Sequence, residues 1–304
     1  MSRAVLVTGG AGFIGSHLVD RLCGAGERVS VLDDLSRGRR EWIHHDADLH
    51  EADIRDVGAV RRIVSEVAPD VVVHLAAMHF IPAVDGAPEL AREVNVDGTR
   101  ILLAALAEQK PLLVLFASTA AVYPDRQGQI DETCPAAPID LYGETKLTGE
   151  GLVQEFAAQT GAHSVVARIF NAIGPRETNP HVVPELVGQL QGGEQAVRLG
   201  DLTPRRDYTD ARDVAAALQA LVDVPGDPVG IFNVGSGRSC SVGELVQECE
   251  RVLGRPIRVE TERARLRRVD RAELVANPGR LRTATGWTPR WSLRETLAEL
   301  LSGT

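Results

Sequence analysis

The stretch Thr8-Gly9-Gly10-Ala11-Gly12-Phe13-Ile14-Gly15 decides the fold. It follows a short apolar run, Ala4–Thr8, and opens a helix-like segment, Ile14–Ala25. Glycine permits a tight turn here and lets the backbone approach a pyrophosphate, whose charge is favoured at a helix N-terminus. Many loops use glycine for turns, but glycines placed between a strand and a helix are what dinucleotide binding requires. We therefore expect cofactor contacts at Gly9, Gly12, Phe13, Ile14 and Gly15.

Short apolar runs then alternate with helix-like segments along the first 170 residues. The runs are rich in Val, Leu and Ile and lack polar–apolar alternation, which is typical of parallel strands buried on both faces. This repeat of strand and helix predicts right-handed crossovers and a Rossmann-type, doubly wound α/β sheet. The further strand candidates are Arg28–Asp33, Val71–Leu75, Leu112–Ala117 and Ser164–Ile169, and the helical segments are Ala59–Val67, Glu89–Glu108 and Leu141–Gln159.

After Asn171, proline and glycine punctuate the chain, so shorter elements are expected. A strand at Gly230–Val234 precedes a helix near Val242–Leu253, a strand around Ile257–Glu260 and two terminal helical segments. We expect a cofactor-binding Rossmann domain over residues 1–170, to which residues 207–237 return. Residues 171–206 and 238–304 should form a smaller, interleaved C-terminal lobe that binds the substrate.

Composition narrows the class of protein. The 304 residues are 44% hydrophobic and 25% charged, which is ordinary for a soluble globular chain. A net charge of -9 argues against nucleic-acid binding. No apolar run or signal-peptide layout indicates a membrane segment or export, so we expect a cytoplasmic protein. The four cysteines are scattered without metal-ligand spacing, so neither a disulfide framework nor a metal site is expected.

Asp33 and Asp34 end the second strand candidate, about twenty residues after the glycines. A carboxylate there can accept hydrogen bonds from the adenosine ribose and would repel the 2′-phosphate of NADP. NAD is therefore the expected cofactor. Three arginines follow closely, so NADP remains an alternative cofactor: Arg37, Arg39 and Arg40. Asp34 also fits a helix-capping role.

Three candidate catalytic residues follow, Thr119, Tyr142 and Lys146. Ser118 and Thr119 end a strand candidate, and Tyr142 and Lys146 lie four residues apart in a helix, on one face. The lysine charge should lower the tyrosine pKa, so that the phenol exchanges a proton with a sugar hydroxyl near neutral pH. The Thr119 hydroxyl can hydrogen-bond the same oxygen. Lys146 is one of only two lysines, beside Lys110, in an arginine-rich chain.

With these motifs, the chain resembles the extended short-chain dehydrogenase/reductase family, in its nucleotide-sugar epimerase and dehydratase branch, over essentially its full length. The resemblance implies that Asp53 and Ile54 lie by the adenine and that Asn95 supports the active-site helix near the cofactor. It also implies that the segment His74-Leu75-Ala76-Ala77 lines the cofactor.

The same resemblance implies a substrate that carries a nucleoside diphosphate. Two arginines would clamp the diphosphate, because a guanidinium fork matches phosphate oxygens. Arg265 or Arg268 could replace Arg267 in this role, and His181 is a further candidate for contact with the sugar or its diphosphate. The expected substrate contacts are His79, Ser118, Thr119, Asn171, Arg206 and Arg267.

Family members oxidise the sugar at C4 and then differ. Sugar 4,6-dehydratases carry acids directly after the catalytic threonine, whereas this chain has Ala120 and Ala121. Methyl groups cannot transfer protons, so a 4-epimerase is the first hypothesis. Two alternatives remain. One is a 4-ketoreductase or an atypical dehydratase, because the run from Arg267 to Arg280 resembles that branch of the family. The other is a catalytically idle binding module. Apolar residues on several faces of the helices near 89–108 and 141–159 resemble a dimer interface, so a homodimer is expected.

Overall fold

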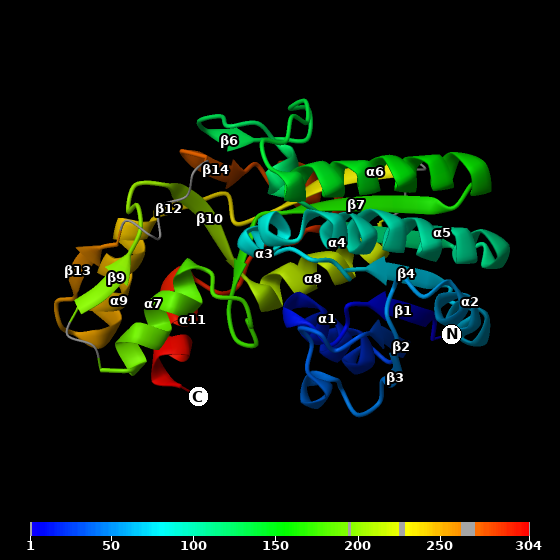
Figure 1. Cartoon of the computed structure of the whole chain (residues 1–304), viewed down its shortest axis with the longest axis horizontal. Coiled ribbons are helices and arrows are strands. Elements are labelled where there is room, and N and C mark those ends of the chain that lie inside the picture. The colour runs from blue at the N-terminus through cyan, green and yellow to red at the C-terminus, as the bar shows by residue number, and fades with distance from the viewer. Residues whose placement is uncertain (1, 194–195, 225–228, 263–270, 304) are drawn as a thin grey trace.

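The computed structural model describes residues 2–193, 196–224, 229–262 and 271–303. Its largest element is a parallel sheet in the order β3-β2-β1-β4-β5-β7-β11 (Figure 1). The order reverses at β1 and β4, which is where doubly wound sheets form their ligand crevice. The predicted fold class is confirmed. The strands are β1 (Ala4–Thr8), β2 (Arg28–Asp33), β3 (Asp48–Glu51), β4 (Val71–His74), β5 (Leu113–Thr119), β7 (His163–Ile169) and β11 (Val229–Val234).

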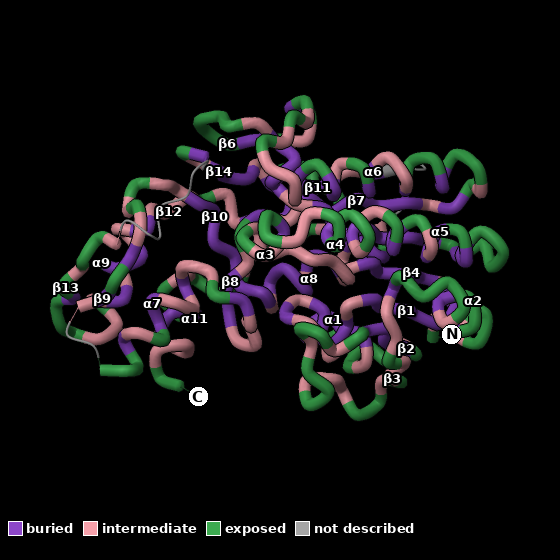
Figure 2. Tube along the Cα trace, viewed as in Figure 1, coloured by how far each residue is buried: buried purple, intermediate pink, exposed green. Residues whose placement is uncertain are grey.

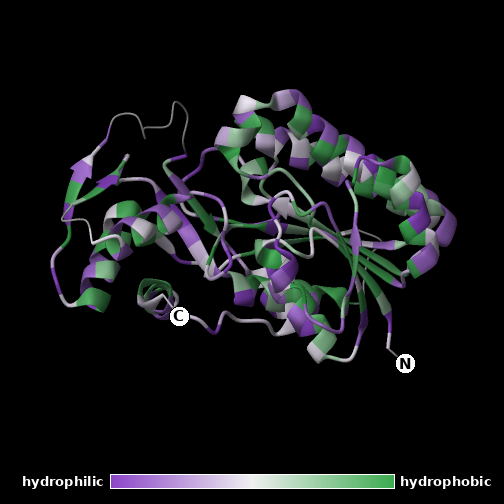
Figure 3. Ribbon diagram, turned by 60° about the horizontal axis from the view of Figure 1, so that its bottom comes forward, coloured by the Kyte–Doolittle hydropathy of each residue, from purple (hydrophilic) through white to green (hydrophobic). Residues whose placement is uncertain are grey.

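Helices cover both faces of this sheet. α1 (Phe13–Gly24) and α8 (Ala211–Val222) pack on one face, and α2 (Val57–Val67), α5 (Gly98–Gln109) and α6 (Leu141–Thr160) on the other. Alternate residues of β1 face the two helix layers. Val5 and Val7 pack in the core on the α1 side, and Leu6 packs in the core on the α2 side. Figures 2 and 3 show strands that are buried and hydrophobic between amphipathic helices. Burial on both faces explains why the apolar runs lack alternation.

A smaller lobe lies at the left of Figure 1, beyond the C-terminal ends of the large sheet. Its core joins helices α7, α9 and α11 to a mixed sheet in the order β12-β10-β14-β6, with β8 also beside β10 and a separate β9–β13 pair. Its elements are β6 (Gln129–Ile130), β8 (Asn171–Ile173), α7 (Val182–Gln191), β9 (Ala196–Leu199), β10 (Arg205–Asp210), β12 (Ser239–Ser241), α9 (Val242–Leu253), β13 (Arg258–Thr261), β14 (Glu273–Ala276) and α11 (Leu293–Ser302).

The two parts are more interleaved than the sequence indicates. β10 crosses the expected boundary between residues 206 and 207 and lies wholly in the small sheet. After β14, helix α10 (Gly279–Thr285) returns to the large domain, where Leu281 and Trp287 enter the core beside α8. The remaining short helices are η1 (Arg40–Trp42), α3 (Ile81–Gly86), α4 (Pro88–Arg92), the π-helical turn η2 (Glu93–Asp97) and η3 (Ala120–Val122).

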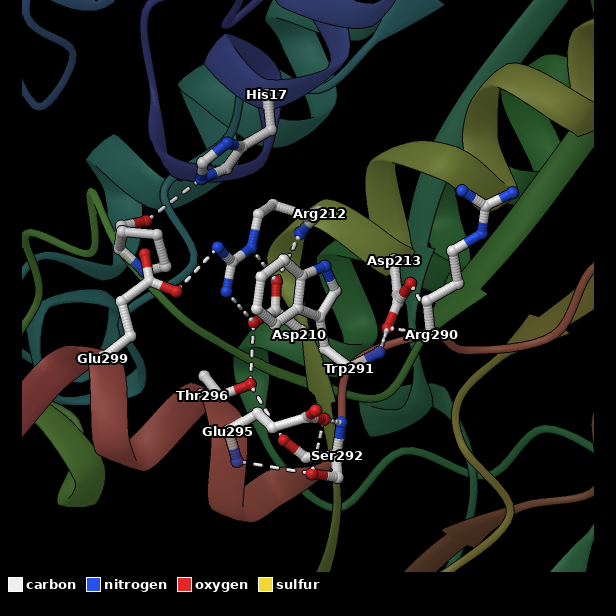
Figure 4. Close-up of polar contacts among 11 residues, drawn as sticks. His17, Asp210, Arg212, Asp213, Arg290, Trp291, Ser292, Glu295, Thr296 and Glu299 are labelled. Carbon is white, nitrogen blue, oxygen red and sulfur yellow. Dashed lines mark hydrogen bonds and ion pairs between the residues drawn. The ribbon is translucent and has the colours of Figure 1, made fainter.

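A polar cluster fastens the C-terminal helix to the large domain (Figure 4). The Arg212 guanidinium pairs with Asp210, the N-cap of α8, and with Glu299 of α11, both at 2.7 Å. It also lies 3.5 Å from the ring centre of Trp291. Asp213 accepts the backbone N–H groups of Arg290 and Trp291. Among the described helices, none is long and apolar enough to cross a membrane.

Candidate active site

The glycine turn brings three backbone segments together at the start of α1. Gly9 has φ +72°, and a Cβ on Gly15 would lie 2.1 Å from the Gly9 carbonyl oxygen. The N-cap of α1 is Gly12, which has no side chain to occupy the free N–H groups, and no acid lies in the first turn. A helix start of this kind binds an anion through its N–H groups and dipole. The loop therefore fits the pyrophosphate of NAD.

We expect Gly15→Ala to destabilise this turn strongly, because backbone and not a flexible side chain opposes the new methyl group. The free energy of unfolding should fall by about 1–3 kcal/mol, and NAD affinity should fall at least about tenfold. Gly24→Ala is the matched control at the other end of α1, where a Cβ meets nothing within 4 Å. Urea unfolding and NAD titration of both variants measure the effects, and equal results for the two would contradict the crowding argument.

Asp33 holds the cofactor loop in place. Its buried carboxylate accepts the backbone N–H of Ala11 at 3.0 Å and that of Leu35 at 2.9 Å. Burial raises the pKa of Asp33, while these hydrogen bonds oppose the rise. Asp34 is exposed, and its carboxylate accepts the N–H and the hydroxyl of Ser36. Both aspartates line the cleft.

The arginines after Asp34 have different surroundings. Arg39 lies over the Trp42 ring and Arg40 pairs with Glu51, whereas Arg37 lines the cleft. On the other side of the nucleotide region, the cleft is lined by Asp53, Ile54, Leu75, Ala76 and Ala77. Except for Asn95, and for Arg267, which lies outside the described residues, the contacts expected from the sequence line one continuous cavity.

Asn95 does not line the cleft with the other expected cofactor contacts, and it binds protein groups instead. It is 1% exposed, its Oδ1 accepts the N–H of Met78, and its Nδ2 donates to the Met78 carbonyl and the Thr145 hydroxyl. It lies in the π-helical turn η2, a distortion that is frequent at functional sites. Asn95 therefore joins the loop after β4 to α6, beside Lys146, as a positioning residue.

Thr119 and Tyr142 meet where β5 ends and α6 begins. Asp140 caps α6 by accepting the Gly143 N–H at 2.8 Å. A Cβ on Gly143 would lie 2.3 Å from the Ala121 carbonyl, so glycine lets the helix approach the strand end closely. The Thr119 and Tyr142 side chains are hydrogen-bonded to each other. Lys146 follows one turn later, with Nζ 4.2 Å from the Phe116 ring centre.

The electrostatics of this site differ from the expectation. Burial raises the pKa of Tyr142, the Thr119 hydrogen bond opposes the rise, and Lys146 is not among the causes of the shift. Burial also lowers the pKa of Lys146 to about 7, against a raising influence of Glu150. The prediction that lysine lowers the tyrosine pKa is therefore wrong, because desolvation outweighs charge at both groups.

The Lys146 pKa predicts a pH-dependent stability. The unfolded chain keeps the lysine proton up to its ordinary pKa of 10.5, whereas the folded chain loses it near 7. Between these values unfolding takes up a proton, so the free energy of unfolding rises with pH. Urea unfolding of the cofactor-free protein at about pH 7 and about pH 9 should show a larger gain for wild type than for Lys146→Met. Equal gains would show that Lys146 does not titrate in this range.

Sequence reasoning missed two groups that hold the site together. Arg271 donates to Asp140 at 2.8 Å, to the Ala121 carbonyl at 2.7 Å and to the Tyr123 carbonyl at 3.2 Å. It therefore joins the loop after Thr119 to the cap of α6. Only the spatial return of β14 brings it there, so sequence carries no local signal for this role.

Glu150 is the second such group, and it lies one helical turn after Lys146. Its carboxylate pairs with Arg168 through two hydrogen bonds of 2.7 and 2.9 Å and accepts the Ser118 hydroxyl. Ser118, expected to contact substrate, thus directs its hydroxyl to Glu150. The i, i+4 spacing from Lys146 could have revealed Glu150 as part of the same helix face.

The cleft is also lined by His79, Asn171 and Arg206. Arg206 is 9% exposed and donates to the Arg205 carbonyl. Arg267, the second arginine expected at the diphosphate, lies outside the described residues, as do Arg265 and Arg268. Among the described arginines that line the cleft, Arg206 and Arg271 are the most buried.

The NAD dependent epimerase/dehydratase family model matches residues 5–235, which include the glycine turn, Thr119, Tyr142, Lys146 and β11. The chain belongs to this family. The predicted resemblance and the NAD cofactor are thereby confirmed. Thr119, Tyr142 and Lys146 line the same cleft as the glycine turn.

Curated relatives and solved structures agree with this assignment. UDP-glucose 4-epimerase of Halalkalibacterium halodurans is 34% identical over 97% of this chain and 93% of its own length. The Thermotoga maritima UDP-glucose 4-epimerase solved with UDP-glucose superposes with a TM-score of 0.92 at 31% identity. The match covers 98% of the present chain and 97% of that structure. The Thermus thermophilus enzyme solved with NAD gives 0.91 at 32% identity, with coverage of 98% and 97%.

Proposed function

We propose that this protein is an NAD-dependent 4-epimerase of UDP-hexoses. The observation that carries the proposal is the hydrogen-bonded pair of Thr119 and Tyr142 in the cleft. The two residues that follow Thr119 are alanines, Ala120 and Ala121. These alanines are 2% and 7% exposed and offer no acid or base for elimination of water. The near full-length similarity to UDP-glucose 4-epimerases supports the same reaction.

When bound, NAD+ would supply the hydride acceptor and a positive charge. A nearby positive charge lowers the pKa of a buried tyrosine. Tyr142 then takes the proton of the sugar hydroxyl and later returns it, acting as both base and acid. Thr119 orients the phenol through their hydrogen bond, and Lys146 contributes its charge one turn away. We assign binding of the diphosphate to Arg206, because a guanidinium fork matches phosphate oxygens.

A turnover screen tests the proposal. UDP-, GDP-, CDP-, ADP- and dTDP-hexoses are incubated with the purified protein without added cofactor, and the products are analysed by mass spectrometry and sugar chromatography. We expect a UDP-sugar isomer of unchanged mass. Loss of water would indicate a dehydratase, gain of two hydrogens a reductase, and no conversion of any sugar a binding protein.

We also propose a cytoplasmic homodimer formed through α5 and α6. The two helices pack side by side and carry the partly exposed apolar residues Ile101, Leu147 and Leu152. Paired helices can meet an identical pair in a four-helix bundle. Light scattering should give about twice the chain mass of 32.7 kDa, and Leu152→Glu should shift the mass toward the monomer. A wild-type monomer at micromolar concentration would refute the dimer.

A further inference from the structure

Three metal-ligand side chains converge in the cleft, although they come from two distant segments. His79 follows β4, and Glu177 and His181 lie between β8 and α7. One ligand atom from each lies within 4.8 Å of the other two. All three side chains line the cleft and are half-buried. This cluster takes no part in the proton transfer assigned to Tyr142.

The hydrogen bonds of His79 favour the tautomer that a metal ligand needs. Its Nε2 lies 3.1 Å from the Asn179 amide nitrogen, which is a donor, so Nε2 is the acceptor and carries the lone pair. The ring also hydrogen-bonds the backbone of Ala77. Histidine ligands of metals have this arrangement, with one nitrogen free to coordinate and the other donating to a backbone carbonyl or carboxylate.

The centre of the cluster is rich in acceptors. The buried Asn179 amide nitrogen lies between two of them, at 3.1 Å from His79 Nε2 and 3.3 Å from Glu177 Oε1. Burial lowers the pKa of His79 and raises that of Glu177. Glu177 Oε1 also accepts the Asn179 backbone N–H at 2.8 Å. A cation at this point would be a stronger partner for both acceptors than the Asn179 side-chain amide.

We propose that His79, Glu177 and His181 bind one zinc ion. Two imidazoles and a carboxylate are a ligand set of zinc sites that keep a fourth position for water or substrate. Tetrahedral coordination would bring the ligand atoms to roughly 3.3 Å apart, a side-chain adjustment of about 1 Å, with the Asn179 amide moving aside. The fourth position would face the cleft, where an oxygen of the bound ligand can reach it.

The charges around His79 define what Glu177 must do. The positive charges of Lys146 and Arg37 both act on the His79 ring. A cation beside them requires the negative charge of Glu177, so removal of that charge alone should abolish tight binding. Glu177→Gln keeps the size and the hydrogen-bonding amide of the side chain and is therefore the diagnostic variant.

The chain provides its own matched control. His44, His45 and Asp46 form a second group with metal-ligand spacing, but it lies within one loop and is mostly exposed. Such a group binds metal weakly and without a closed geometry. His45→Gln should therefore leave stoichiometric zinc binding unchanged, whereas Glu177→Gln and His181→Gln should weaken it.

The test uses the full chain without a histidine tag, with its bound NAD. Zinc content after dialysis is measured by elemental analysis, affinity by calorimetric titration with zinc chloride, and geometry by the visible spectrum of the cobalt(II) form. We expect one zinc per chain, a tetrahedral cobalt spectrum, and at least about tenfold weaker binding in Glu177→Gln and His181→Gln. Retained NAD and an unchanged melting temperature show that each variant is folded.

Two results would overturn the zinc site. Wild-type protein that binds no zinc at saturation would show that Asn179 alone satisfies the cluster. Binding that survives in Glu177→Gln or disappears in His45→Gln would place the metal elsewhere. None of these measurements depends on turnover, so failure of the proposed epimerase activity would be seen separately.

Discussion

Tyr142→Phe should lower turnover of the UDP-sugar by about 100- to 10,000-fold, which is the range that a positioned acid/base contributes. The substitution removes only the phenolic oxygen that meets Thr119 and leaves the ring in α6. NAD affinity and the melting temperature should stay close to wild type, because the glycine turn and Asp33 lie elsewhere in the cleft. Steady-state kinetics and NAD titration measure both effects.

Tyr123→Phe is the matched control for Tyr142→Phe. Tyr123 is fully buried, and its hydroxyl donates to Asn233 at 2.8 Å. Its loss should cost about 1 kcal/mol of stability and leave turnover per folded molecule largely intact. If Tyr142→Phe turned over near the wild-type rate, Tyr142 could not be the acid/base.

Arg168→Met should lower the free energy of unfolding by about 3–5 kcal/mol, because it strands the Glu150 carboxylate in the core. The side chains of this pair are 5% and 2% exposed. Of the hydrogen bonds described above, Glu150 would then keep only the one from the Ser118 hydroxyl. Chemical unfolding monitored by tryptophan fluorescence gives the loss.

Two comparisons isolate the cause of this loss. Arg62→Met breaks the exposed pair with Glu66 and should cost less than about 1 kcal/mol. Glu150→Gln, added to Arg168→Met, removes the stranded charge and should restore part of the stability. Strictly additive losses in the double variant would mean that the two side chains do not act as a pair.

The apolar strands were predictable because their composition reflects burial on both faces. β1 and β2 begin and end where the sequence indicates, and α9 likewise. β3 was missed because this edge strand reads Asp-Leu-His-Glu and is only partly buried. β10 was missed because it reads as a charged loop, Arg-Arg-Asp-Tyr-Thr-Asp, although its residues are mostly buried.

The polar residues of β10 show why such a strand escapes a hydrophobicity pattern. Asp207 is fully buried and accepts the backbone N–H groups of Ser236, Gly237 and Ala276, so internal hydrogen bonds replace its hydration. These partners lie far along the chain and carry no signal near residue 207. The YxxxK and glycine motifs were predictable since their chemistry is local, whereas Arg271 and Glu177 depend on the tertiary fold.

The interleaving of the two lobes limits where the chain could be cut and how the fold could evolve. Leu281 and Trp287 complete the core of the first domain from beyond the second, and β6 reaches from the first half into the small sheet. A cut between the two lobes therefore leaves neither part with all of its core residues. Such an architecture must change through substitutions and loop insertions, since the small lobe cannot be exchanged as one continuous segment.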